Sequence, residues 1–442
     1  METLNNIVLT IQNYMSNYVL IIALLGAGLW FSFRLGFIQV RGFGEGMKRT
    51  FGGLFSKKGE AGADGMSSFQ ALATAIAAQV GTGNIAGAAT ALAIGGPGAI
   101  FWMWIAAFLG MATIYAEAIM AQKYKTVGAD GQVTGGPVYY IRAAFKGTFG
   151  KVLAGIFAIL ITLALGFMGN AVQSNSIAAS FHTAFGVPQW IMGLVVAVIA
   201  IFVFMGGMKR IAKVTETIVP FMAALYIVGS LIVIIYNYKN IPYAFASIFI
   251  GAFSPSSVVG GAAGATVKLA LTKGVARGLF SNEAGMGSTP HAHAVAKVDH
   301  PVEQGFVAMT GVFIDTFIVL NLTALVILTT KSIPTGKTGA ELSQYAFSTL
   351  YGKGGDIFVA ICMFFFAFST IIGWYFFGQA NIKYLFGPKA VKIYSVVAAA
   401  CVFLGSLAEV DLVWNMADCF NSLMVVPNIL ALFALSKVIS QV

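Results

Sequence analysis

Two polar, glycine-rich stretches interrupt segments that are otherwise apolar enough to cross a membrane. They read QVGTGN at residues 79–84 and SNEAGMGS at residues 281–288. Each would break a helix, and a break at membrane depth survives only where it is buried in protein or lines a polar cavity, because an unpaired backbone group in lipid is costly. Paired interruptions in corresponding halves of a chain are the best sequence indication of the binding site of a secondary transporter.

A broken helix can bind a carboxylate and a cation side by side. Its second half begins with free N–H groups at the positive end of the helix dipole, which suit a carboxylate. Its first half ends in free carbonyls, which suit Na⁺ or an ammonium group. In the first break the carbonyls of Ala77 and Val80 would face a cation, and the Gln79 amide could take either role. The N–H groups predicted to face the carboxylate belong to Thr82, Gly83 and Asn84.

Glycine pairs in membrane helices also serve as close packing faces, and one glycine-rich stretch alone would not separate the two interpretations. Two breaks with polar neighbours and opposite topology favour binding. Asn170, in the middle of the segment 151–183, is either a ligand contact or an interhelical hydrogen bond. Ser369 and Thr370 could both point at one cation if carbonyls complete its shell, or could bond to carbonyls of their own helix.

Acidic and histidine side chains near the second break suggest other chemistry. Glu283 lies inside the break, where fixing the unwound backbone is preferred to carrying a proton. His291 and His293 resemble a metal pair, but their i,i+2 spacing does not place both rings on one helix face, which favours a polar inner vestibule. The sequence contains neither G-x-S-x-G nor G-x-x-x-x-G-K-[S/T], so the simplest hydrolase signature and the usual ATP site are absent. Uphill transport would therefore use an ion gradient, and no organic cofactor is expected.

The elements that position these residues follow from composition. Of 442 residues, 58% are hydrophobic and 10% are charged, whereas soluble domains carry roughly 25% charged residues. Many apolar runs exceed the ~20 residues that cross a bilayer core, and they are continuous rather than alternating as in a β-barrel. The chain is predicted to be an all-α polytopic membrane protein. Its net charge of +10 does not indicate nucleic-acid binding, because the basic residues gather in alternate short loops.

Eleven transmembrane spans are predicted, at residues 18–35, 67–94, 98–122, 151–183, 188–206, 216–236, 262–294, 304–330, 355–383, 391–408 and 413–435. Most of the 26 basic residues, Lys57 and Lys58 among them, fall in loops on one side, which places the N-terminus outside and the C-terminus in the cytoplasm. The broken spans 2 and 7 are then opposite in direction, so spans 2–6 and 7–11 form an inverted 5+5 repeat. The single transporter domain comprises an extra first helix with a cytoplasmic loop (1–66), a first repeat (67–236) and a second repeat (237–442). Shorter helices are expected at 137–142, 241–253 and 338–351.

Three long motifs carry a resemblance to a known family. They are GGPGAIFWMWI at 95–105, RGLFSNEAGMGS at 277–288 and QVGTGNIAG at 79–87. With them the chain resembles the alanine or glycine:cation symporter family over nearly its whole length. The resemblance implies a leucine-transporter-type fold and uptake of L-alanine, glycine and in some members D-alanine, with Na⁺ or, in some members, H⁺.

The resemblance also implies which residues bind. The sodium ligands would be the carbonyls of Ala77, Val80 and Phe366 with the hydroxyls of Ser369 and Thr370. Asn84 matches a position that serves a second sodium in some relatives. A small side-chain pocket would be crowded by aromatic residues and methionine, and Trp374 shares a helix face with Thr370 because it lies four residues further on. The predicted substrate-binding residues are Gln79, Thr82, Gly83, Asn170, Phe280, Asn282, Gly285, Met286 and Trp374, with Phe167 as a further crowding candidate.

The sequence is therefore interpreted as a Na⁺-coupled importer of alanine and glycine in the plasma membrane, working by alternating access. Its expected partners are the amino acid and membrane lipids, with no nucleic acid and no obligatory protein partner. One alternative is a carrier of the same fold that couples to H⁺ through Glu283 or carries another small solute. Another is an intramembrane enzyme that uses Ser288, His291 and His293.

Overall fold

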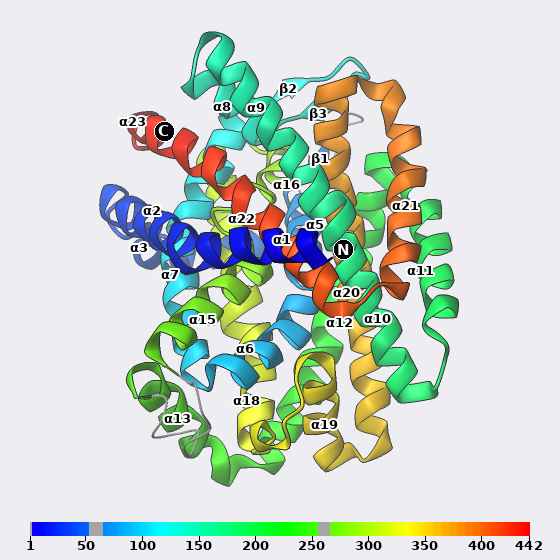
Figure 1. Ribbon diagram of the computed structural model, residues 1–442. Coiled ribbons are helices and arrows are strands. Elements are labelled where there is room, and N and C mark those ends of the chain that lie inside the picture. Colours follow the sequence, from blue (N-terminus) through cyan, green and yellow to red (C-terminus); the bar gives the residue numbers. More distant parts are fainter. Residues whose placement is uncertain (1, 53–64, 255–265) are drawn as a thin grey trace.

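The computed structural model describes residues 2–52, 65–254 and 266–442, and helices make up nearly all of them (Figure 1). Lys57 and Lys58, and the first residues of the predicted span 262–294, lie outside the described residues. Within the described part, seven helices are long and apolar enough to cross a membrane: Gly98–Lys123, Gly147–Phe185, Gly207–Tyr236, Pro301–Thr329, Lys353–Phe386, Pro388–Leu407 and Val413–Ala434. Shorter apolar helices are Leu20–Arg34, Gly83–Gly95 and Gln189–Phe204. The number of eleven crossings and the orientation stay predictions.

Apart from the first helix, the elements of the first half occupy the predicted segments, with shifts at their ends. They are α1 (Glu2–Tyr14), η1 (Met15–Val19), α2 (Leu20–Arg34), α3 (Ile38–Arg41), α4 (Phe43–Gly52), β1 (Met66–Ser67), α5 (Ser68–Gln79), η2 (Gly83–Gly87), α6 (Ala88–Gly95), α7 (Gly98–Lys123), β2 (Thr126–Val127), β3 (Val133–Thr134), α8 (Pro137–Ala144), α9 (Gly147–Ile161), η3 (Thr162–Gly169), α10 (Asn170–Phe185), α11 (Gln189–Phe204) and α12 (Gly207–Tyr236).

The second half repeats this pattern of long helices with one interruption. Its elements are η4 (Tyr238–Asn240), α13 (Ile241–Phe253), α15 (Val267–Asn282), α16 (Pro290–Ala294), β4 (Ala296–Lys297), α17 (Pro301–Val312), η5 (Phe313–Leu320), α18 (Asn321–Thr329), η6 (Ile333–Thr335), α19 (Gly339–Tyr351), α20 (Lys353–Phe386), η7 (Pro388–Ala390), α21 (Val391–Leu407), α22 (Val410–Ala434) and α23 (Ser436–Ile439). The predicted short helices correspond to α8, α13 and α19.

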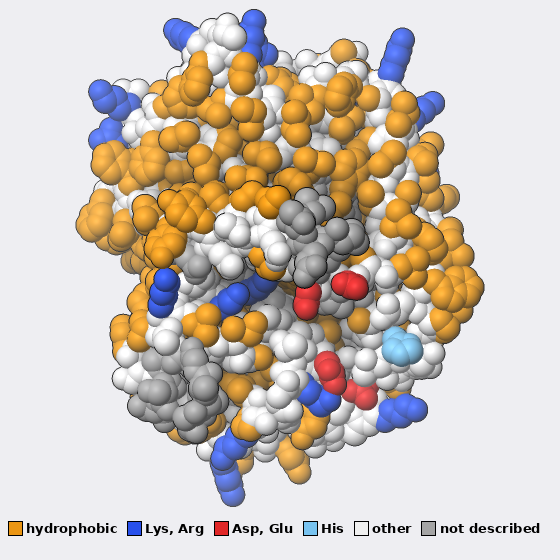
Figure 2. Space-filling view, viewed as in Figure 1, with side chains coloured by type: hydrophobic (Ala, Val, Ile, Leu, Met, Phe, Trp, Pro, Cys, Tyr) orange, Lys and Arg blue, Asp and Glu red, His pale blue; other side chains and the backbone are white. Residues whose placement is uncertain are grey.

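The outer surface is that of a protein in lipid. Phe202 on α11 and Ile393 on α21 are 68% and 70% exposed, and an apolar surface this extensive marks contact with a membrane. Figure 2 shows that the face drawn is largely hydrophobic and that most of its Lys and Arg side chains lie toward the upper and lower ends. The polar groups of the breaks are instead buried inside the bundle.

Both predicted breaks are confirmed. The helix α5 starts at a capping box, in which Ser67 accepts from the Gln70 N–H and Gln70 accepts from the Ser67 N–H, both at 3.1 Å. It ends at Gln79, and Val80 is extended, with ψ 90°. In the second half, α15 ends at Asn282, and Glu283 takes a left-handed conformation with φ 59°. Gly285 and Gly287 follow with φ +84° and +82°, a region that glycine adopts without strain.

Two contacts hold the broken segments close to each other and to α20. The strand β1, which leads into α5, pairs in parallel with β4, which follows α16. On α20, a Cβ added at Gly373 would lie 2.9 Å from the Cβ of Ala78 on α5. Helices approach this closely only where one residue lacks a side chain. The break in α5 therefore lies directly against the middle of α20.

The first helix differs from its prediction. The span was expected to begin at residue 18, but helix extends from Glu2 to Arg34 through α1, η1 and α2. Asn6 and Asn13 interrupt the apolar pattern of the sequence, yet both are exposed and do not disturb the packing. In Figure 1, α1 (blue) crosses α22 (red), and Gln12 donates a 3.1 Å hydrogen bond to Asp418 there. This hydrogen bond joins α1 to α22.

Candidate functional site

The break in α5 releases two backbone carbonyls from helical hydrogen bonding. In a continuous helix the Ala77 carbonyl would accept from the Gly81 N–H, but that N–H donates to Asn84 Oδ1 at 2.9 Å. The Val80 carbonyl would accept from the Asn84 N–H, which instead donates to the Gly81 carbonyl at 3.2 Å. Ala77 and Val80 thus present carbonyl oxygens toward α20.

Five oxygen atoms converge at this point. Thr370 Oγ1 lies 2.8 Å from the Ala77 carbonyl, 3.4 Å from that of Val80 and 3.0 Å from that of Phe366. Ser369 Oγ lies 3.3 Å from the Ala77 carbonyl and 2.9 Å from the Phe366 carbonyl. All five residues are buried. A set of neutral hydroxyl and carbonyl oxygens is the donor set that a hard monovalent cation requires, because the hydroxyl lone pairs can turn toward the ion.

Gly81 has a steric role in this group of oxygens. A Cβ added to Gly81 would lie 2.3 Å from Thr370 Oγ1 and 3.1 Å from Gln173 Oε1. The absence of a side chain is what lets both polar atoms reach the broken backbone. The glycine that breaks the helix therefore also admits the groups that would complete a site.

Two of the three backbone N–H groups that were predicted to bind the substrate carboxylate donate to other groups of the protein. The Thr82 N–H donates to Gln173 Oε1 at 3.1 Å, and the Asn84 N–H is used within the break. Among the three predicted donors, only the Gly83 N–H has no partner within the described residues. Gln173 was not predicted as part of the site. Its position one turn after Asn170, on a buried helix face, was the available signal.

Several buried polar atoms around this break have no hydrogen-bond partner in the described part of the chain. They are Gln79 Oε1, Thr82 Oγ1, Asn170 Oδ1 and Gln173 Nε2. Leaving such a group unsatisfied costs about 1–3 kcal/mol. The two atoms in the break and the two on α10, which meets the break through Gln173, are therefore groups to which a polar ligand would supply partners. Gln79 Nε2 is satisfied, since it donates to the Asn282 carbonyl at 2.8 Å and so joins the two breaks.

An aromatic wall closes one side of this region. The ring centroids of Phe280 and Trp374 lie 5.5 Å apart at 88°, and Trp374 Nε1 donates to the Glu283 carboxylate. Glu283 also accepts from the Ser288 hydroxyl, so its carboxylate ties the unwound segment together. Met286 is fully buried in the same segment.

Gly285 lies with a different set of residues. Its N–H donates to Glu117 Oε2 at 3.0 Å, and the Gly287 N–H donates to Glu117 Oε1 at 2.9 Å. Asn428 Nδ2 donates to Glu117 Oε1 at 2.6 Å and to the Gly285 carbonyl at 2.9 Å. A carboxylate on α7 therefore binds the backbone N–H groups of the second break, although Gly285 was predicted to bind substrate.

A third buried carboxylate connects the two breaks. Asp315 in η5 accepts from Asn84 Nδ2 at 2.7 Å, from Ser281 Oγ at 3.0 Å and from Thr316 Oγ1 at 2.9 Å. Asn282 Nδ2 donates to Thr316 Oγ1 at 3.2 Å. In the sequence, Asp315 is an acidic residue within an otherwise apolar segment. The contacts show that it fixes the distance between the first and second breaks.

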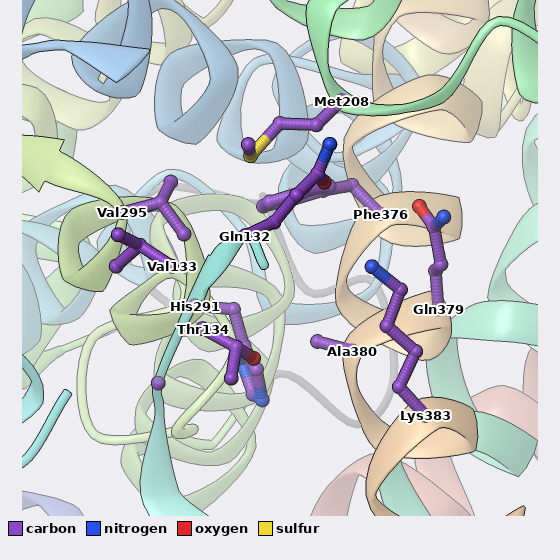
Figure 3. Close-up of a pocket in the computed structure, with 11 residues that line it drawn as sticks. Gln132, Val133, Thr134, Met208, His291, Val295, Phe376, Gln379, Ala380 and Lys383 are labelled. Carbon is purple, nitrogen blue, oxygen red and sulfur yellow. The ribbon is translucent and has the colours of Figure 1, made fainter. Parts of the chain in front are cut away.

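The two histidines have separate partners. His291 Nε2 lies 2.9 Å from Asn381 Nδ2, and His293 Nδ1 lies 2.8 Å from Gln304 Nε2. His291 also lines a small cavity with Lys383, which Figure 3 shows in close-up. Lys383 forms an ion pair with Asp130 in the β2–β3 loop. Burial alone would raise the pKa of Asp130, but hydrogen bonds and the Lys383 charge hold that pKa below its ordinary value.

The chain is similar to known proteins in sequence and in fold. A family model described as "Sodium:alanine symporter family" matches residues 1–442. The chain is 43% identical to the sodium/alanine symporter AgcS of Methanococcus maripaludis, covering 98% of this chain and 95% of that one. It is 41% identical to the probable sodium/glutamine symporter GlnT of Bacillus subtilis, covering 99% and 90%. The solved structure of MhsT in complex with L-phenylalanine has the same fold, with a TM-score of 0.60 and 14% identity over 86% of this chain and 98% of that one.

Proposed function

The chain belongs to the sodium:alanine symporter family, and we propose that it carries L-alanine and glycine, and also D-alanine, into the cell together with Na⁺. It is a multi-pass membrane transporter of the leucine-transporter type rather than an enzyme. In this proposal it lies in the plasma membrane with its N-terminus outside and its C-terminus in the cytoplasm.

The observation that carries the proposal is the convergence of five buried oxygens at the break in α5. We assign Na⁺ to the carbonyls of Ala77, Val80 and Phe366 and to the hydroxyls of Ser369 and Thr370. The printed distances between these hydroxyls and carbonyls are 2.8–3.4 Å. Carbonyls of an unwound helix are the common ligands of the coupling ion in transporters with broken helices. Because Ala77 and Val80 belong to the broken segment, a bound ion stabilises the break itself.

The amino acid is placed beside the ion, where the unpaired polar atoms gather. Its carboxylate would accept from the Gly83 N–H and from Thr82 Oγ1, and its ammonium group would donate to Gln79 Oε1 and Asn170 Oδ1, which have no partner within the described residues. The aromatic wall would limit the side chain to a small group by steric exclusion. The remaining proposed contacts are Phe280, Asn282, Gly285, Met286 and Trp374; Gly285 acts through Glu117 in this arrangement.

Sodium linkage provides the test of this function. We expect purified protein to bind L-alanine at least about tenfold more tightly in NaCl than in choline chloride, because the ion and the amino acid share the same broken segment and their coupling is reciprocal. Titration calorimetry or binding of labelled alanine at matched ionic strength measures the difference. Equal affinity in the two salts would contradict sodium coupling at this site.

A second candidate, coupling to H⁺, rests on Glu283. This carboxylate is buried in the second break, and it accepts hydrogen bonds from Ser288 and Trp374. A buried ionisable group in a transport pathway can carry a proton, although the two donors give Glu283 a sufficient structural role.

The variant Glu283→Gln separates the two candidates. The amide keeps one acceptor for Trp374 or Ser288, so we expect slower uptake that still depends on Na⁺ and is unaffected by an imposed pH gradient. Uptake of labelled alanine into proteoliposomes with a Na⁺ gradient or a pH gradient alone measures both dependences. A pH-driven uptake in the unmodified protein that disappears in the variant would favour the proton carrier.

A further inference from the structure

A cavity of about 340 Å³ lies at one end of the helix bundle, between the β2–β3 loop, the first turn of α12, the last turns of α20 and the start of α21. This volume falls in the range of small-molecule binding sites. The cavity shares Gln132, Met208, Gln379 and Lys383 with the small cavity of Figure 3. None of the residues proposed above for the amino acid or for Na⁺ lines it. The proposed transport function therefore leaves this cavity without an occupant.

Positive charge predominates in this cavity. The charged side chains that line it are Asp130, Lys209, Lys383 and Lys392. Lys383 and Asp130 form an ion pair, so their charges cancel. Lys209 and Lys392 are exposed, and neither makes a hydrogen bond or an ion pair with another described residue. Two ammonium groups without an acidic partner at one cavity favour an anionic ligand.

The helix α12 begins at this cavity, and its first turn adds backbone donors. The first N–H groups of a helix have no acceptor within that helix, and those of Gly207, Met208 and Lys209 have no other partner within the described residues. Gly207 has φ +65°, and a Cβ added there would meet no atom within 4 Å, so the backbone is open to a ligand at this point. Since α12 is 30 residues long, the positive end of its dipole also favours a negative charge here.

A buried amide gives a second, independent indication of a ligand. Gln379 lines the cavity and is only 7% exposed, yet its Oε1 has no hydrogen-bond partner in the described part of the chain. Figure 3 shows Gln379 and Lys383 extending from the same helix, α20. The amide can present either its oxygen or its NH₂ group by rotating about its last bond, and the NH₂ group would donate to an anion. A buried amide left unpaired beside positive charges indicates a missing partner.

The rim of the cavity continues into an apolar surface. Phe202, near the end of α11, and Ile393, next to Lys392 on α21, are 68% and 70% exposed, and α11 and α21 pack side by side (Figure 1). The Arg210 guanidinium lies 4.6 Å from the centroid of the Phe202 ring, which places that ring beside the first turn of α12. An anion site that borders a lipid-facing apolar surface suits a phospholipid better than a soluble anion.

We propose that this cavity binds the phosphate group of an anionic phospholipid. The phosphate accepts from the first N–H groups of α12, from Lys209 and Lys392, and from the Gln379 amide, while the acyl chains lie along the exposed apolar faces of α11 and α21. Basic pockets between transmembrane helices bind such head groups in other membrane proteins. The bound lipid joins α12, α20 and α21, and its binding does not depend on which solute the central site carries.

Native mass spectrometry of the purified full-length protein, titrated in detergent with phosphatidylglycerol, tests the proposal. We expect one phosphatidylglycerol per chain to bind saturably, and phosphatidylcholine, whose head group is zwitterionic, to bind about tenfold more weakly. Lys209→Gln and Lys392→Gln are each expected to weaken phosphatidylglycerol binding about fivefold, through loss of one charge near the phosphate. Lys213→Gln is the matched control, because Lys213 lies one turn further along α12 but pairs with Glu216 at 3.0 Å. This control is expected to bind the lipid as the unmodified protein does.

Two further measurements keep the outcome decisive. Lys209 and Lys392 lie on different helices, so the proposal remains testable if one variant does not fold. Inorganic phosphate in large excess is expected to leave phosphatidylglycerol bound, because the apolar faces hold the acyl chains; complete displacement would assign the cavity to a free phosphate and overturn the lipid. Unchanged phosphatidylglycerol binding in the double variant Lys209→Gln, Lys392→Gln would overturn the site itself. Alanine binding in NaCl by the same samples is expected to stay unchanged, so failure of the proposed transport function would be seen separately.

Discussion

Alanine uptake is expected to fall by about two orders of magnitude when Glu117 is replaced by glutamine. The carboxylate of Glu117 accepts from three donors, the N–H groups of Gly285 and Gly287 and the Asn428 amide, at 2.6–3.0 Å. Glutamine keeps one acceptor and puts an NH₂ group where the other oxygen was, so in either rotamer two donors face each other. Hydrogen bonds to a charged group contribute about 1.5–3 kcal/mol each, and about 1.4 kcal/mol corresponds to a tenfold change.

Uptake into proteoliposomes and the unfolding temperature in detergent measure this effect together. We expect both to fall, because Glu117 fixes the unwound backbone on which the second half of the pathway depends. Glu303→Gln is the matched control, since Glu303 is partly exposed and pairs with Arg49 at 3.2 Å. Surface ion pairs contribute little, so this control is expected to transport normally. Wild-type uptake by Glu117→Gln would show that the second break does not need its carboxylate.

The second large effect is expected from Thr370→Val. Valine keeps the shape of threonine but replaces the hydroxyl that lies within 3.4 Å of the carbonyls of Ala77, Val80 and Phe366. The ion would lose one of five oxygen ligands and meet a methyl group instead. We therefore expect the Na⁺ concentration for half-maximal alanine uptake to rise by about ten- to a hundredfold, equivalent to roughly 1.4–2.8 kcal/mol.

A sodium titration of alanine uptake in proteoliposomes, at constant ionic strength, measures this shift. The control is Thr329→Val, because Thr329 is equally buried and its hydroxyl donates to the Leu325 carbonyl of its own helix at 2.7 Å. That variant is expected to keep the wild-type sodium dependence. If Thr370→Val also keeps it, the ion binds elsewhere.

Local chemistry allowed much of this architecture to be predicted from the sequence. The breaks at residues 79–84 and 281–288 follow from glycine and polar residues within apolar runs, and both are confirmed. The grouping of Ser369 and Thr370 with the Ala77 carbonyl was instead implied by the family resemblance, and in the structure both hydroxyls contact that carbonyl. The breaks depend on residues that are close together in sequence. The contacts between α5 and α20 depend on the fold that the family resemblance implies.

Contacts between distant segments could not be predicted in the same way. Gln173, Asp315 and Glu117 bond to residues of the broken segments that lie between 34 and 231 positions away in sequence. Hydrophobic periodicity places such residues on a buried helix face, but it does not show which backbone group each side chain contacts there. The contact between the Gly285 N–H and Glu117 is of this kind, and the role of Gly285 in substrate binding stays a prediction.

Glu117 also makes the two helix breaks unequal in what their backbone N–H groups can bind. An inverted repeat presents two similar helix breaks, each with backbone N–H groups able to hold a carboxylate. In the second break, Gly285 and Gly287 already donate to Glu117, whereas in the first the Gly83 N–H has no partner within the described residues. The chain thus fills one of two equivalent positions with a carboxylate of its own. Within the described residues, this asymmetry leaves the first break with a backbone N–H group that can still donate to a carboxylate from outside the chain.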